Sequence, residues 1–440
     1  MVETINLKKY RSFIASTSPI RKTGKVKNVA GLIVEGDGPA VPLGSFCVIY
    51  SNIRKTSIEA QVVGFRDRTT LLMPLEEIVG IEPGSIIETR EEFPTFNISP
   101  EILGRVIDGN GRPLDGLGAL PMGVDYPING SPMNPMERAL IREPLDLGVR
   151  AINGLLTCAR GQRLGIFAGT GIGKSVLLGM IARNTEADVN VIALVGERSR
   201  EVREFIENNL GTEGLKKSVV VAASSDRPAL TRIRAALIAC AIAEFFRDQG
   251  KDVMFMMDSV TRLARAQREI GLSIGEPPTT RGYPPSVFSL LPKILERAGT
   301  SDEKGTITGL YTVLVEGDDL DEPVSDAVMA VLDGHIVLSR KLASHNLYPA
   351  IDLLNSISRL MIEVVSDDHY ELSRQFRDIY ATYKEAEDLI NIGAYVKGSN
   401  PEIDRAIKKH ALITEYIRQG IYETVSMDDS IEQMRKILKD

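Results

Sequence analysis

The sequence predicts an α/β protein whose parallel-sheet core follows an N-terminal β-barrel and precedes a C-terminal helical domain. Three changes of pattern along the 440 residues support this prediction. Short runs alternate apolar and polar residues between about residues 25 and 92, near-continuous apolar runs alternate with helical segments from about residue 98, and only helical spacing follows in the last eighty or so residues. We therefore place three domains at residues 1–92, 93–362 and 363–440.

The first region is expected to form a small antiparallel barrel. Its apolar runs read as strands and include residues 31–34, 46–50 and 58–63. Turn signals at Gly36-Asp-Gly38 and Pro83-Gly84 separate the strands at a spacing that suits a barrel, although a sandwich would give the same pattern. Residues 1–20 precede the barrel as a short extension whose helical spacing is too brief to assign.

The second region contains five apolar runs that we expect to be buried strands. They cover residues 162–167, 190–195, 218–222, 252–257 and 309–315. Because these runs are nearly continuous and helical segments separate them, they predict a parallel sheet covered by helices on both faces. In the third region, residues 371–392 and 401–420 place apolar side chains at helical spacing.

Composition excludes several classes of protein. The formal net charge of −7 argues against a nucleic-acid partner, because neutralising phosphates requires a surplus of lysine and arginine. The apolar run 235–246 is shorter than the roughly 20 residues of a membrane span, and the N-terminus lacks the apolar core of a signal peptide. Cys47, Cys158 and Cys240 form neither a disulfide nor a metal-ligand pattern, which suits a reducing cytosol. We expect a cytoplasmic protein without a transmembrane segment.

A glycine-rich segment, Ala168-Gly-Thr-Gly-Ile-Gly-Lys-Ser175, lies between a predicted strand and a predicted helix. In this context it reads as a phosphate-binding loop, in which backbone N–H groups approach the phosphates closely, the lysine reaches them and the serine hydroxyl reaches Mg²⁺. The expected nucleotide contacts are Gly169, Thr170, Gly171, Ile172, Gly173, Lys174, Ser175 and Val176. Ala168 departs from the usual first glycine, and the alternative is a glycine-rich turn that only opens a helix.

Hydrolysis also requires a placed water and a neutralised charge, and two strand ends offer carboxylates. Asp258 ends the run before it, so it is expected beside the phosphate loop in the magnesium shell; the alternative is a cap for the next helix. Glu197 follows another strand at the same edge of the sheet and would polarise the attacking water. The nearby Glu201, Glu204 and Glu207 are expected on a solvated helix face.

Several segments in order resemble the hexameric rotary ATPases, a family with a RecA-like core, and most closely the flagellar type III protein-export ATPases. The segments are Phe167-Ala-Gly-Thr-Gly-Ile-Gly-Lys-Ser175, Val195-Gly-Glu-Arg-Ser-Arg200, Asp258-Ser-Val-Thr-Arg-Leu-Ala-Arg-Ala-Gln-Arg268, Gly275-Glu-Pro-Pro-Thr-Thr-Arg-Gly-Tyr-Pro-Pro-Ser-Val-Phe288 and Tyr348-Pro-Ala-Ile-Asp352. The resemblance covers essentially the whole chain and is weakest in residues 1–20. The family tolerates alanine at the position of Ala168.

The resemblance implies roles for individual residues, with ATP as substrate and Mg²⁺ as cofactor. It makes Glu197 the catalytic carboxylate, places Arg198 near the γ phosphate and makes Asp258 the magnesium-side aspartate. It also implies that Tyr348 stacks on adenine and that Arg359 is a finger inserted into the adjoining subunit's site, although taken alone Arg359 would be read as a surface helix residue. Either Tyr416 or Ile417 would supply the second residue of the adenine pocket.

The resemblance further implies a homohexamer at the cytoplasmic face of the inner membrane, bound peripherally at the export gate. Its expected partners are a coiled-coil stalk protein, a peripheral-stalk regulator, the export gate, chaperones and export substrates. Glu316-Gly-Asp-Asp-Leu-Asp321 resembles a stalk-contacting loop, for which a solvated turn is the alternative, and residues 393–404 resemble a stalk-contacting helical tip.

Three functions from different classes fit these features. The leading one is a flagellar export ATPase, and a virulence-type (injectisome) secretion ATPase shares every catalytic feature. A rotary synthase subunit or an RNA-translocating hexamer is the third. A synthase would need a paired noncatalytic subunit, whereas this chain carries both Glu197 and Arg359, and the negative net charge does not favour a translocase.

Overall fold

The computed structural model describes residues 21–51, 56–91, 94–130, 133–302, 305–315, 317 and 319–439. The chain divides into two compact units: the first comprises the chain up to Pro94 with residues 273–276, and the second comprises the remainder. The predicted extension at residues 1–20 lies outside the described residues.

The first unit contains a closed antiparallel barrel of six strands in the order β1-β2-β5-β4-β3-β6. Its strands are β1 (Thr23–Ala30), β2 (Ile33–Asp37), β3 (Phe46–Tyr50), β4 (Ser57–Arg66), β5 (Thr69–Pro74) and β6 (Ile86–Glu91). Alternate side chains point inward, and Val34, Ile49, Leu72 and Ile87 form a fully buried core. The barrel prediction is therefore confirmed and the sandwich is excluded.

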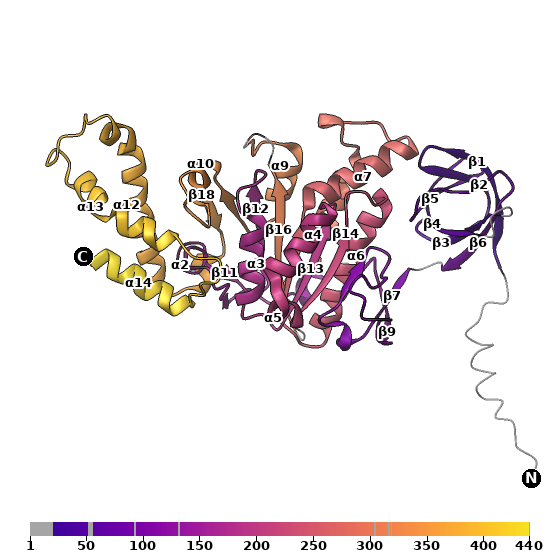
Figure 1. Ribbon diagram of the computed structural model, residues 1–440, viewed down its shortest axis with the longest axis horizontal. Helices are drawn as coiled ribbons and strands as arrows, with labels where there is room; N and C mark the ends of the chain where they lie inside the picture. The colour runs from indigo at the N-terminus through magenta and orange to yellow at the C-terminus, as the bar shows by residue number, and fades with distance from the viewer. Residues whose placement is uncertain are drawn as a thin grey trace, which may run out of the picture. The chain divides into compact units, whose positions relative to one another are not determined.

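An eight-stranded sheet forms the centre of the second unit, in the order β18-β17-β12-β16-β15-β13-β14-β8 (Figure 1). The strands are β8 (Val106–Asp108), β12 (Arg163–Ala168), β13 (Val189–Val195), β14 (Ser218–Ala223), β15 (Val253–Asp258), β16 (Ile307–Leu314), β17 (Gly334–Leu338) and β18 (Ile351–Ser358). Every neighbouring pair is parallel except β17 and β18. We call the edge where the parallel strands end the carboxyl edge, and the edge where they begin the amino edge.

Helices connect these strands because parallel neighbours require crossovers. They are α3 (Lys174–Asn184), α4 (Ser199–Glu204), a π-helical turn (Phe205–Leu210), α5 (Gly211–Lys216), α6 (Ala229–Asp248), α7 (Val260–Ile274), α8 (Pro285–Leu295), α9 (Pro323–Met329) and α10 (Arg340–Ser344). Smaller elements complete the unit: β7 (Thr95–Ile98), β9 (Val124–Pro127), β10 (Pro144–Leu145), α2 (Arg150–Leu155), β11 (Cys158–Ala159) and three single 3₁₀ turns (Pro100–Ile102, Pro135–Glu137 and Thr280–Gly282).

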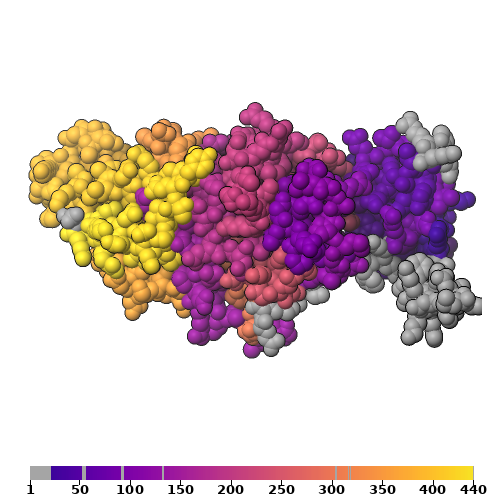
Figure 2. Space-filling view, turned by 60° about the horizontal axis from the view of Figure 1, so that its bottom comes forward, coloured from indigo at the N-terminus to yellow at the C-terminus, as the bar shows by residue number. Residues whose placement is uncertain are grey.

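The C-terminal part is helical, as predicted, and packs against the sheet-containing part (yellow in Figure 2). It comprises α11 (Met361–Val364), α12 (Asp367–Asn391), α13 (Pro401–Ile417) and α14 (Met427–Lys439). Ser366 and Asn400 cap the N-termini of the two longest of these helices by accepting bonds from backbone N–H groups. Buried side chains such as Phe376 and Ile413 belong to the same apolar cluster as Leu164 of β12.

The predicted fold class is confirmed, and all five predicted strands are present. Three sheet strands were not predicted: β8, β17 and β18. The boundaries at residues 92/93 and 362/363 remain predictions. All three cysteines are buried, and burial raises the pKa of the Cys47 thiol to about 11 and of the Cys240 thiol to about 12. Among the described helices, no segment is long and apolar enough to cross a membrane.

Candidate nucleotide-binding and catalytic site

The glycine-rich loop leaves the carboxyl end of β12 and enters α3 at Lys174. Gly171 and Gly173 have φ angles of 77° and 89°, a backbone conformation that L side chains rarely adopt. No side chain caps the first turn of α3, so its N–H groups are available to an anion. The loop thus has the backbone geometry of a phosphate cradle, with Gly169 and Ile172 buried, Thr170 exposed, and Ser175 and Val176 half-buried on the first turn of α3.

Three charged side chains from separate elements meet beside this loop. The Lys174 ammonium forms an ion pair with Asp258 Oδ1, and its Nζ lies 3.5 Å from Glu197 Oε1. Asp258 ends β15 and Glu197 follows the neighbouring β13, so the parallel register brings both to the carboxyl edge. The exposed fraction of the Asp258 side chain is 3% and that of Glu197 is 8%.

Glu197 has the electrostatics of a proton acceptor. Burial and the charge of Asp258 raise the pKa of its carboxyl from 4.5 to about 8, against the opposing charges of Lys174 and Arg262. Its Oε1 atom is buried and accepts no hydrogen bond from the described residues. A carboxyl with a pKa near the working pH can accept a proton from an attacking water.

Two partners of these carboxylates were missed by the sequence analysis. Arg262, on the first turn of α7, lies 3.0 Å from Glu197 Oε2 through its Nη2, and its Nη1 donates to the carbonyl of Gly196. Thr312 of β16 donates from Oγ1 to Asp258 Oδ1 over 2.8 Å. Arg262 belongs to the segment that carries the family resemblance, whereas no sequence pattern singled out Thr312.

Glu201 lies on the first turn of α4, where its side chain is 42% exposed and pairs with Arg198 at 3.3 Å. A hydrogen bond with Glu197 lowers the pKa of the Glu201 carboxyl. Glu204 and Glu207 pair with Arg200 and Arg203 on the exposed face, as expected.

The expected magnesium ligands fit the ion in part. Ser175 lies on the first turn of α3, and Asp258 lies at the end of β15. Mg²⁺ in nucleotide sites takes one or two protein oxygens and completes its octahedron with phosphate oxygens and water. A hydroxyl and a carboxylate suffice for that role, and no group of three or more His, Cys, Asp or Glu residues that could hold a metal is found among the described residues.

Tyr348 lies directly beside the phosphate loop. A Cβ placed on Gly173 would lie 3.4 Å from the Tyr348 ring. Tyr348 as a residue is 39% exposed. Tyr416 and Ile417 are both buried; the Tyr416 ring centroid lies 4.9 Å from that of Phe376, and its hydroxyl donates to the carbonyl of Ser430. Both side chains therefore belong to the core, and neither offers an open face to an adenine ring in this conformation.

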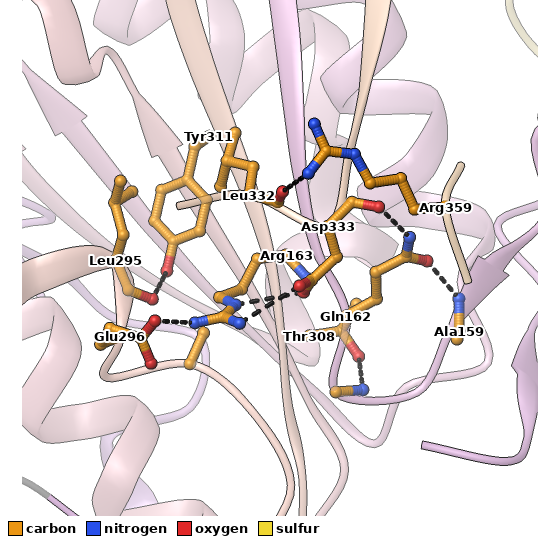
Figure 3. A network of polar contacts seen from close by, with 12 residues as sticks. Ala159, Gln162, Arg163, Leu295, Glu296, Thr308, Tyr311, Leu332, Asp333 and Arg359 are labelled. Carbon is orange, nitrogen blue, oxygen red and sulfur yellow. Dashed lines mark hydrogen bonds and ion pairs between the residues drawn. The ribbon is translucent and has the colours of Figure 1, made fainter. Parts of the chain in front are cut away.

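Arg198 and Arg359 lie apart from the cluster. The Arg198 side chain is 78% exposed and pairs with Glu201 at 3.3 Å. Arg359 follows β18, whose last residue pairs with the first residue of β17, so Arg359 lies at the amino edge. There its Nη1 contacts the carbonyl of Leu332 at 3.5 Å (Figure 3). The structure thus brings Lys174, Glu197 and Asp258 together at one edge and presents Arg359 at the other.

The segments expected to meet a stalk are only partly described. Glu316 and Asp318 lie outside the described residues, while Asp319 pairs with Arg281 at 3.0 Å. At the helical tip, Val396 is an exposed apolar residue, and Ile392 directly before the tip is exposed as well.

Three family models match the chain. They are the ATP synthase alpha/beta family beta-barrel domain over residues 26–90, the nucleotide-binding domain of the same family over residues 148–358, and the T3SS EscN ATPase C-terminal domain over residues 365–436.

Similar proteins cover nearly the whole chain. The flagellum-specific ATP synthase of Bacillus subtilis (strain 168) is 53% identical over 96% of this chain and 97% of its own length. The type 3 secretion system ATPase of Xanthomonas euvesicatoria is 45% identical over 97% of this chain and 96% of its own. The solved structure of the assembled ATPase EscN from the enteropathogenic E. coli type III secretion system is 45% identical, covers 94% of this chain and 100% of its own, and gives a TM-score of 0.89. The chain belongs to the ATP synthase alpha/beta family and is an ATPase of the group that contains the flagellum-specific and type III secretion enzymes.

Proposed function

We propose that this chain forms a homohexameric motor whose ATP hydrolysis, with Mg²⁺, energises or regulates type III export of flagellar proteins. The cluster of Lys174, Asp258 and Glu197 carries the proposal, because it places a phosphate cation, a magnesium-side carboxylate and a proton acceptor around one phosphate cradle. The flagellar system is favoured because the relatives at 53% and 49% identity are flagellum-specific ATP synthases.

Each group has a distinct task in this proposal. Backbone N–H groups of residues 169–176 and the Lys174 ammonium bind the phosphates, and Tyr348 packs on the adenine. Ser175 and Asp258 hold Mg²⁺, which neutralises charge on the phosphate oxygens when bound. Glu197 takes a proton from the attacking water, while Arg262 and Thr312 keep the two carboxylates in place.

Arg359 completes the site of a neighbouring subunit in this proposal. It lies at the amino edge, whereas the cluster of its own chain lies at the carboxyl edge. A ring of identical chains can bring one subunit's amino-edge arginine to the next subunit's carboxyl edge. Arg198, exposed directly before α4, would lie near the γ phosphate from the side of its own chain.

The partners and location are proposals of the same kind. The solved EscN relative has also been described in complex with its central stalk EscO, with a TM-score of 0.87 and 44% identity to this chain. By analogy, a coiled-coil stalk protein would bind this chain at residues 316–321 and 393–404. A peripheral-stalk regulator, the export gate, chaperones and export substrates would be met at the cytoplasmic face of the inner membrane.

A virulence-type secretion ATPase is the second candidate, since the C-terminal family model is named for EscN. Deleting the gene in its native bacterium separates the two. Loss of flagellar filament protein from the medium with intact injectisome secretion supports the flagellar system, and the opposite result supports the second candidate.

The shared site is tested with two variants and their mixture. We expect Arg359→Ala to bind ATP normally but to hydrolyse it about 10³- to 10⁵-fold more slowly, the range for loss of an arginine finger. Glu197→Gln should bind nucleotide and also fail to turn over. Equal mixing creates intact sites at about a quarter of interfaces, each with Glu197 from one subunit and Arg359 from the next, and activity should return. Full turnover by Arg359→Ala at every protein concentration would remove Arg359 from the mechanism.

A further inference from the structure

A polar network at the amino edge surrounds the backbone of Arg359 (Figure 3). Its centre is a bidentate ion pair between Arg163, the first residue of β12, and Asp333, the residue before β17. Arg163 Nε lies 3.1 Å from Asp333 Oδ2, and Arg163 Nη2 lies 3.2 Å from Oδ1. The backbones are paired as well: Arg163 N donates to Asp333 Oδ2 at 2.9 Å, and Asp333 N donates to the Arg163 carbonyl at 2.9 Å.

This pair fixes the turn that supports Arg359. The Arg359 N–H donates to the Asp333 carbonyl at 3.0 Å, and its guanidinium contacts the carbonyl of Leu332 at 3.5 Å. The guanidinium itself has no closer partner among the described residues that would hold it. Its direction therefore depends on where residues 332–333 lie.

A second arm of the network holds the residue before Arg359. Gln162, which is fully buried, donates to the Asp333 carbonyl at 3.3 Å and to Ser358 Oγ at 3.0 Å. Ser358 Oγ in turn donates to the carbonyl of Thr157 at 2.8 Å. The end of β18 is thus held at two consecutive residues: Ser358 by Gln162, the residue before β12, and Arg359 by Asp333, which is itself paired with Arg163.

β12 is the strand whose other end opens into the phosphate loop of the same chain. We propose that Asp333, clamped by Arg163, is a positioning residue for Arg359, so that the strand carrying one subunit's phosphate loop also aims that subunit's arginine at its neighbour's site. This inference rests on the proposed role of Arg359 as an intersubunit finger. Arg163 and Asp333 both lie at the edge opposite the phosphate loop, so in this proposal they act through Arg359.

The first test is the kinetics of Asp333→Asn in the full-length protein. Asparagine keeps the shape of the side chain but loses the negative charge that binds Nε and Nη2 of Arg163. We expect kcat to fall about 10- to 100-fold with an unchanged KM for ATP, since a misplacement of about 1 Å in a catalytic group can cost about 100-fold. An unchanged kcat would overturn the inference while leaving the role of Arg359 intact.

Asp252→Asn is a matched control. Asp252 also directly precedes a parallel strand, β15, at the amino edge, and it pairs with an arginine, Arg160, at 2.7 Å. No contact joins it to Arg359 among the described residues. Its substitution should lower stability comparably and leave kcat unchanged, whereas equal loss of kcat in both variants would show a general effect of loosening this edge.

Mixed rings decide which site Asp333 serves. Mixed with Glu197→Gln, Asp333→Asn should regain activity as Arg359→Ala does, because both lack a working finger and keep a working base. Mixed with Arg359→Ala, it should regain none. The reverse pattern would show that Asp333→Asn damages the phosphate loop of its own chain, and would overturn the inference.

A double variant tests the same point without mixing. This is useful if the subunits of a ring hydrolyse ATP strictly in order, because inactive sites could then block the intact ones. Asp333→Asn combined with Arg359→Ala should be no slower than Arg359→Ala alone, because Asp333 acts through the side chain already removed. A further slowing would overturn the inference. If Asp333→Asn fails to fold, Ser358→Ala removes only one hydroxyl from the same network, and the same three comparisons apply to it with a smaller loss of kcat.

Discussion

The two edges of one sheet are built differently. At the carboxyl edge, Lys174, Asp258 and Glu197 are buried and in contact with one another, so their positions are fixed within a single chain. At the amino edge, Arg359 is exposed, and only its backbone is firmly held, by the carbonyl of Asp333. The charges at the carboxyl edge pair with one another within the chain, whereas the amino edge exposes the Arg359 guanidinium.

This difference separates binding from chemistry. A buried cluster meets the nucleotide in the ground state and in the transition state, so changes at the carboxyl edge should affect affinity, stability or proton transfer. An exposed arginine that neutralises charge developing during the reaction should affect kcat alone.

Lys174→Ala should have the largest effect at the carboxyl edge. It removes the phosphate cation and leaves Asp258 and Glu197 without their shared partner. We expect turnover to fall at least about 10³-fold, the upper range for loss of one charge-stabilising donor. We also expect a loss of about 3–5 kcal/mol in unfolding free energy, as for a broken buried ion pair, because Asp258 loses its ammonium partner.

Steady-state turnover and thermal unfolding measure the two losses. Lys216→Ala is the control, because that lysine pairs with Glu213 on an exposed helix face. Lys174→Ala with wild-type turnover would contradict the assignment of the phosphate loop.

The pH profile of the wild-type enzyme should reveal Glu197. Its carboxyl has a pKa of about 8, and only its ionised form accepts a proton. In the profile of kcat/KM, which reports the free enzyme, we expect a rise of about tenfold per pH unit below that pKa and a plateau above it. A profile that is flat from pH 6 to 8 would exclude Glu197 as the base.

Unfolding temperature gives an independent reading of the same group. The pKa of Glu197 is raised on folding from 4.5 to about 8, so the folded state favours the neutral acid. The resulting stabilisation is complete below 4.5 and is lost as the pH rises to about 8. The amide in Glu197→Gln does not titrate, so the unfolding temperature of the wild type should fall relative to this variant across that range.

Gln419→Leu should have the smallest effect. The Gln419 side chain accepts from Arg150 N at 2.7 Å and donates to the carbonyls of Gly148 and Glu423, each at 2.8 Å. These side-chain bonds hold Gln419 in place, and its backbone N–H donates to the Tyr348 carbonyl at 2.9 Å. We expect KM for ATP to rise about 3- to 10-fold, the equivalent of about 1 kcal/mol for a lost buried hydrogen bond, with kcat unchanged.

Gln375→Leu on the surface of α12 is the control, since its amide bonds only to Glu371 among the described residues. A fall in kcat at constant KM for Gln419→Leu would contradict the separation of binding from chemistry. A residue that supports nucleotide binding at the carboxyl edge would then affect kcat alone, as expected only for Arg359 and its supporting residues at the amino edge.

The parallel strands could be predicted because burial on both faces leaves a continuous apolar run, as in Val189–Val195. β17 and β18 could not, because neither is a continuous apolar run: β17 alternates buried and half-buried residues, and β18, the outermost strand, carries Asp352 and Asn355. Asp258 and Glu197 could be placed at one edge from the sequence because neighbouring parallel strands run in the same direction, so their carboxyl ends meet at the same edge of the sheet.

Contacts between distant segments were beyond the sequence. Thr312 meets Asp258 across 54 positions, and only the order of strands in the sheet brings them together. Likewise, the spacing around Tyr416 and Ile417 is compatible with a ligand-facing residue or a core residue, and the packing of the C-terminal helices places both in the core.

The burial of all three cysteines has a practical consequence for experiments on this chain. The thiolate is the reactive form of cysteine, and the raised pKa values of Cys47, Cys158 and Cys240 keep each thiol protonated at neutral pH. The native sequence is therefore its own background for site-directed labelling. A cysteine introduced at Tyr422, which is 81% exposed, would react with a maleimide probe well before any native thiol.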